Sequence, residues 1–188
     1  MFMTYRAALA ATGAAVLVLL AGAGPLQAQS VGERSGVNSL LGVSPSTDDF
    51  VRTVALSDMF EIQSARLAQE RSMNASVRAF ADRMLKDHQA TTVQLKEAIG
   101  GRAGIKAPPT ALDQAHETKL NQLRNLKGPG FDRQYRTEQI AAHEDAVSLF
   151  TRYSEGKEDQ ALRDFAMHAL PTLKEHLRMA RALPIMRD

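Results

Sequence analysis

The chain of 188 residues contains no cysteine and no tryptophan. Without thiols it cannot form disulfides, thiolate metal sites, iron–sulfur clusters or a cysteine nucleophile. It also lacks a charge excess, because 23 basic side chains face 21 acidic ones; this argues against a role that rests on electrostatic attraction to nucleic acid. No P-loop, GxGxxG, GxSxG or HExxH motif occurs, and no nucleophile–base pair stands out, so the sequence gives little support to an enzyme.

Residues 1–28 have the order of a secretory signal peptide. A short start carrying Arg6 precedes an uncharged run of Ala, Val, Leu and Gly, and small residues at Ala23 and Ala28 offer two cleavage points. An uncleaved anchor is the alternative, since about 17 to 25 apolar residues span a bilayer. The abundance of Ala and Gly favours cleavage. We therefore expect a periplasmic protein with no stable membrane anchor, and residues 29–46, rich in Ser and Gly, predict a flexible leader.

From residue 47 the pattern becomes helical, and no stretch alternates with the period of two that a strand requires. The first long helix is expected over residues 47–71, the second from the break at 72–74 to Gly100, the third over 131–155 and the fourth over 158–183. A shorter helix is expected over 111–127. Short turns join long helices into antiparallel pairs. The prediction is an all-α, ferritin-like four-helix bundle over residues 47–185, with a long crossover that contains the shorter helix.

Each long helix places an ionisable side chain in its otherwise apolar stripe, at the three-to-four residue spacing that faces a bundle core. These four residues are Glu61, His88, His143 and His176. Counted from a common end of the bundle at 1.5 Å per residue, Glu61, His88 and His143 agree in height to within about 3 Å. His176 falls about 9 Å higher than His143 by the same count, so it either joins them through the Pro171 kink or lies one shell away.

A spaced set of aromatic, acidic and histidine residues runs through the same helices. It comprises Phe50, Glu61, Ala68, Phe80, Ala81, Met84, Asp87, His88, Phe131, Asp132, Tyr135, His143, Leu170, Pro171 and His176. This pattern resembles the exported bacterial family catalogued as domain of unknown function 4142, over roughly residues 49–183. The resemblance implies a ferritin-like bundle, no assigned activity, and characteristic positions at Glu61, His88, His143 and His176.

The pattern departs from that of di-iron bundles. Those proteins place a glutamate three residues before each ligand histidine, whereas here the equivalent positions are Leu85, Ile140 and Leu173. Iron storage and di-iron oxidase chemistry are therefore not expected.

Two interpretations remain open for the four ionisable residues of the stripes, Glu61, His88, His143 and His176. Three imidazoles and a carboxylate would suit one transition metal, with zinc, copper, nickel and ferrous iron as candidates and no organic cofactor. Asp87, Glu144 and Glu175 could then orient the imidazoles, and Met84 and Met179 could approach the site. Alternatively, the protein is a non-metal envelope stress or protein-interaction module, and its buried polar cluster only fixes the helix register. The sequence does not identify a protein partner.

Overall fold

The computed structural model describes residues 30, 39 and 41–184. The predicted signal peptide at 1–28 lies outside the described residues, as does most of the predicted leader at 29–46. Within the described part of the chain, no helix combines the length and the apolar character needed to cross a membrane.

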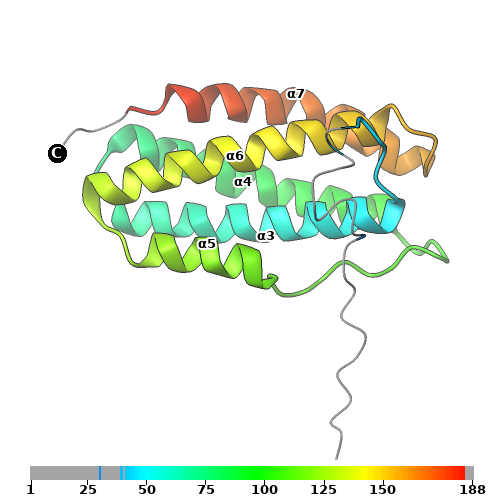
Figure 1. Ribbon diagram of the computed structural model, residues 1–188, viewed down its shortest axis with the longest axis horizontal. Helices are drawn as coiled ribbons and strands as arrows, with labels where there is room; N and C mark the ends of the chain where they lie inside the picture. Colours follow the sequence, from blue (N-terminus) through cyan, green and yellow to red (C-terminus); the bar gives the residue numbers. More distant parts are fainter. Residues whose placement is uncertain (1–29, 31–38, 40, 185–188) are drawn as a thin grey trace, which may run out of the picture.

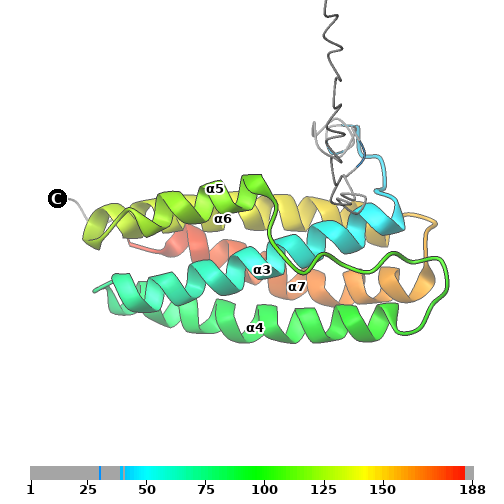
Figure 2. The same ribbon diagram turned by 90° about the horizontal axis from the view of Figure 1, so that it is seen from below.

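The described chain is all-helical. Its five helices are α3 (Thr47–Arg71), α4 (Ala75–Ile99), α5 (Gln114–Arg124), α6 (Gly128–Ser154) and α7 (Gln160–Ala182). Figures 1 and 2 show four long helices side by side, with α5 lying along the outside of the bundle. Helix α3 packs on α4 and α6, and α7 packs on α4 and α6. The predicted helical bundle with a shorter helix in its crossover is therefore confirmed.

Side chains at the helix starts explain most of the boundaries. The Ser46 hydroxyl accepts a hydrogen bond from the Asp49 N–H, and Asn74, Asp113 and Asp159 cap α4, α5 and α7 in the same way. Such caps satisfy backbone N–H groups that have no partner within the helix. Helix α5 is shorter than expected at both ends, because it is capped by Asp113 at its start and ends at Arg124.

The third long helix begins earlier than the sequence suggests. We expected residues 128–130 to break the chain, but α6 begins at Gly128, which has a φ of 54°, and Pro129 lies in its first turn. A proline there loses no helical hydrogen bond, and its fixed φ suits the turn. Pro129 therefore favours the start of this helix and does not break it.

The core consists of two apolar clusters with a polar layer between them. One cluster, which includes Phe60, Phe80, Phe131 and Tyr135, lies towards the end of the bundle where α6 begins. The other, which includes Phe50, Phe150, Tyr153, Leu162 and Phe165, lies towards the end where α3 begins. Every long helix passes from one cluster to the other through buried polar residues, namely Asp58, Glu61, Ser64, His88, Gln139, His143 and His176.

Candidate metal centre

Three imidazoles from three helices meet in the polar layer. His88 comes from α4, His143 from α6 and His176 from α7, and none is more than 3% exposed. Their ring centroids are 5.6 Å apart for His88–His143, 5.6 Å for His88–His176 and 5.3 Å for His143–His176. We call these residues the histidine triad.

One ring nitrogen of each triad residue lies within 4.8 Å of the other two. An ion with metal–nitrogen bonds of about 2.1 Å in tetrahedral geometry separates its ligands by roughly 3.4 Å. Small rotations of the rings therefore suffice to bring all three nitrogens onto one ion. The three buried histidines could hold a metal ion.

The outer nitrogen of each ring has a fixed partner. Nδ1 of His88 lies 2.8 Å from Oδ1 of Asp58, and Nδ1 of His143 lies 2.8 Å from the backbone oxygen of Gln139. Nε2 of His176 lies 2.8 Å from Oδ2 of Asp87. Metal-binding histidines almost always donate their second N–H to a carboxylate, a backbone carbonyl or water, which fixes the ring orientation. The triad has this arrangement on all three rings.

The inner nitrogens have no such partners. Among the described residues, none hydrogen-bonds to Nε2 of His88, Nε2 of His143 or Nδ1 of His176, although all three atoms are buried. A buried polar atom without a partner costs about 1 to 3 kcal/mol. Three such atoms on adjacent rings therefore destabilise the core unless a ligand satisfies them.

Burial keeps the imidazoles neutral. It lowers the pKa of His88 to about 4 and that of His143 to about 3, and it also lowers the pKa of His176 despite the hydrogen bond to Asp87. Metals bind the neutral form of imidazole. At neutral pH the three imidazoles are therefore in the uncharged form that metal binding requires.

Two carboxylates of different character hold the triad. Burial raises the pKa of Asp58 well above its usual value, and its Oδ2 accepts a hydrogen bond from Thr92. Asp87 is partly exposed: burial raises its pKa, but hydrogen bonds from Arg83 and His176 outweigh that effect and the pKa is lowered. Asp87 is therefore a carboxylate at neutral pH, whereas burial favours the protonated form of Asp58.

Glu61 lies in the same layer but is not part of the converging group of ligand atoms. Its Oε2 accepts a hydrogen bond of 2.6 Å from Nε2 of Gln139, the residue whose carbonyl holds His143. Burial raises its pKa to about 8. Oε1 of Glu61 is buried, and no described residue gives it a partner. Coordination by Glu61 stays a prediction.

His176 belongs to the triad although the residue count placed it about 9 Å too high. The count assumed that the helices end level with one another. Figures 1 and 2 show that α7 begins beyond the end of α6, so the count started from the wrong level. The 5.3 Å between the ring centroids of His143 and His176 places the two residues at the same height.

The family model "Domain of unknown function (DUF4142)" matches residues 33–183. The chain belongs to DUF4142. The resemblance seen in the sequence is thereby confirmed, and no curated protein matches the chain.

A solved structure shares the fold of this DUF4142 protein. It is described as "CopM in the Cu(II)-bound form", and it superposes with a TM-score of 0.63 at 14% sequence identity. The match covers 74% of this chain and 96% of the other. At this identity the likeness concerns the fold.

Of the three carboxylates expected to orient imidazoles in this DUF4142 chain, only Asp87 does so. Glu144 and Glu175 are exposed and pair with Arg181 and Arg178. Asp58 instead orients the ring of His88. It lies in the apolar stripe of α3, one turn before Glu61, and this buried position is the feature of the sequence that could have predicted its role. The contribution of Gln139 comes from its backbone carbonyl, so its side-chain type carries no signal.

The remaining candidates lie elsewhere. Met84 is fully buried and Met179 partly buried, and both belong to the apolar cluster around Phe80. His116 pairs with Asp113 at the start of α5, and the exposed His168 bonds to the backbone of its own helix.

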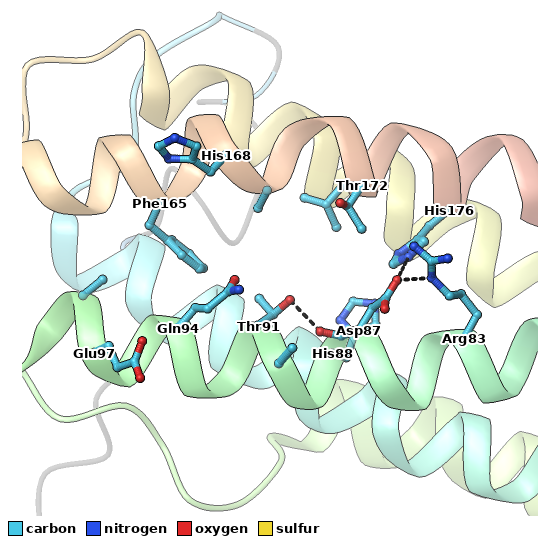
Figure 3. Close-up of a pocket in the computed structure, with 14 residues that line it drawn as sticks. Arg83, Asp87, His88, Thr91, Gln94, Glu97, Phe165, His168, Thr172 and His176 are labelled. Atoms are coloured by element: carbon cyan, nitrogen blue, oxygen red, sulfur yellow. Dashed lines mark hydrogen bonds and ion pairs between the residues drawn. The ribbon is translucent and has the colours of Figure 1, made fainter.

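A groove lined by both polar and apolar side chains reaches the triad from the surface. It has a volume of about 480 Å³, and His88 and His176 lie among its lining residues. Figure 3 shows it between α4 and α7, with Thr91, Gln94 and Thr172 along its length and Asp87 linked to both His176 and Arg83 at one end.

Proposed function

We propose that this protein binds a single transition-metal ion through Nε2 of His88, Nε2 of His143 and Nδ1 of His176. The observation that carries the proposal is the same division on each ring: the outer nitrogen is hydrogen-bonded, and the inner nitrogen is buried without a partner among the described residues.

The alternative of a purely structural polar cluster accounts less well for this division. A cluster that only fixes helix register gains its stability by satisfying its polar atoms through one another. Here the inner nitrogens of all three rings remain without partners among the described residues. A divalent cation would satisfy all three at once.

The surrounding charges suit a divalent cation. Three neutral imidazoles leave its two positive charges uncompensated, and Asp58 and Asp87 stand behind His88 and His176. With an ion bound, Nε2 of His88 would be a ligand and its Nδ1–H would donate to the Asp58 carboxylate, which would bring negative charge close to the ion.

Imidazole ligands suit copper, zinc, nickel and iron. We propose Cu(II) as the first ion to test, because the structural neighbour carries it. We further propose Glu61 as the fourth ligand, since its Oε1 lies buried in the same polar layer without a partner among the described residues.

A metal titration of the purified protein tests the proposal. We expect one Cu(II) per chain, measured by elemental analysis after gel filtration and by calorimetry. The His88→Ala/His143→Ala variant should lose this equivalent, because one imidazole alone cannot retain the ion. His168→Ala is the matched control, because this exposed histidine lies outside the triad, and it should bind as the wild type does.

Equal, sub-stoichiometric copper in the wild type and in the double variant would contradict the proposal and favour the interaction module. Circular dichroism of the double variant keeps the comparison valid, because the helical content must be retained for the loss to be assigned to the ligands.

A further inference from the structure

The groove between α4 and α7 differs from the other large pocket in what it offers at its inner end. It touches His88 and His176, which are two of the three triad residues. The second pocket has a volume of about 690 Å³ and is lined mainly from α3, α5 and α6, with His88 and Thr91 from α4 and Leu173 from α7. Of the triad it touches only His88, and it does so beside Asp58, the residue that occupies the outer nitrogen of that ring.

The groove lining has the chemistry that a hydrated cation needs. Carboxylates attract a cation electrostatically, and carboxylate and amide oxygens can replace water molecules bound to a hydrated ion. Along the groove lie Glu97, Gln94, Thr91 and Thr172, and Asp87 stands at the triad (Figure 3). Both hydrogen bonds that hold Asp87, from Arg83 and His176, go to Oδ2. Neither of these bonds occupies Oδ1.

We infer that this groove is the encounter site and access route of the metal ion, and that the ion passes from the Asp87 carboxylate to the triad. The inference rests on the proposed function, because it assigns a path to the same site. It assigns the second pocket no part in metal exchange.

The absence of native cysteine permits a selective test. Thr172 lines only the groove and Ser57 lines only the second pocket, and both are half-buried. Thr172→Cys and Ser57→Cys are each alkylated with iodoacetamide, which adds a small group, or with N-phenylmaleimide, which adds a bulky one. Stopped-flow absorbance then follows Cu(II) uptake, and a chelator follows its release.

The bulky group at position 172 should slow uptake and release at least tenfold by comparison with the small group, and by the same factor, so that the equilibrium affinity is unchanged. At position 57 the two adducts should exchange copper at equal rates. Circular dichroism and melting curves of the four adducts check that the fold is retained.

Exchange that is unaffected by the bulky group at position 172, or slowed by the one at position 57, would overturn the access route while leaving the metal site in place. Failure of the unmodified protein to bind copper at equilibrium would instead overturn the proposed function and the route with it. The two failures are therefore distinguishable.

Discussion

At the scale of single residues, the triad is defined by which nitrogen each ring turns inward. His88 and His143 use Nδ1 for their outer bonds, whereas His176 uses Nε2. The outer partner therefore selects the tautomer in which the inner nitrogen carries a lone pair when the ion is bound. Substitutions of these partners should weaken metal binding without removing a ligand.

Asp58→Asn tests this role of the outer partner. An amide oxygen is a weaker acceptor than a carboxylate and lacks its charge, so we expect Cu(II) affinity to fall by about 10- to 100-fold. The stoichiometry of one ion per chain should be retained, as measured by calorimetry. Glu144→Gln is the control: this carboxylate adjoins His143 in sequence but pairs with Arg181 at the surface, and its loss should leave the affinity unchanged.

Glu61 should make the stability of the metal-free protein depend on pH. Its pKa is about 8 in the folded state against 4.5 as the ordinary value, so the folded state binds more protons between these limits. Its contribution to stability is complete below pH 4.5 and is lost as the pH rises through 8.

The measurement compares Glu61→Gln with the wild type by urea unfolding at pH 5 and pH 9, in the presence of a chelator. We expect the wild type to lose more stability than the variant between these two pH values. An equal loss in both proteins would show that Glu61 ionises as freely in the folded state as in the unfolded one.

At the scale of helices, the sequence predicted the arrangement better than the boundaries. The apolar periodicity located all four long helices, because burial of one face dominates their stability. The ends depend on local chemistry that a pattern does not resolve. The Gly128–Gly130 segment contains two glycines and a proline and reads as a break, yet it forms the first turn of α6.

For the candidate site, the sequence likewise predicted which residues are buried but not which partners they contact. The three-to-four residue spacing places His88, His143 and His176 on the buried faces, which is a property of the backbone alone. The partners were not predictable in this way, because they depend on side-chain rotamers and on the offset between helices. Asp87 and Glu175 each precede a triad residue by one position, but only Asp87 points at an imidazole, and it serves the ring of another helix.

Pro171 offers a test at the helix scale, since α7 continues through it. A proline inside a helix removes one hydrogen bond and costs about 3 kcal/mol. Pro171→Ala should therefore raise the free energy of unfolding of the metal-free protein by up to about 3 kcal/mol, as measured by urea denaturation.

Pro129→Ala is the matched control, because a proline in the first turn of a helix carries no such cost, and it should change the stability little. His176 follows Pro171 by five residues in the same helix. If Pro171 also positions His176, the more stable Pro171→Ala variant should bind Cu(II) more weakly. Lower stability of Pro171→Ala would contradict the helical account of this residue.

At the scale of the whole molecule, the proposed ion joins two halves of the chain. His88 belongs to the α3–α4 hairpin, whereas His143 and His176 belong to the α6–α7 hairpin. An ion that binds only the folded state stabilises it by about 2.7 kcal/mol when its free concentration is one hundred times the dissociation constant. We expect the melting temperature to rise with Cu(II) concentration in the wild type and in His168→Ala, and to stay constant in His88→Ala/His143→Ala.

The polar layer lies between the two apolar clusters and contains groups from both helical hairpins, which has a consequence for local unfolding. In this layer the α4 and α7 helices, which belong to different hairpins, are joined by the hydrogen bond between His176 and Asp87. Without an ion, we expect each hairpin to open locally by itself. Coordination of one ion by His88, His143 and His176 would join the two hairpins, so that the four long helices would open as one unit. Amide deuterium exchange would then report a single protection energy for all of them, and adding a chelator would split it into two.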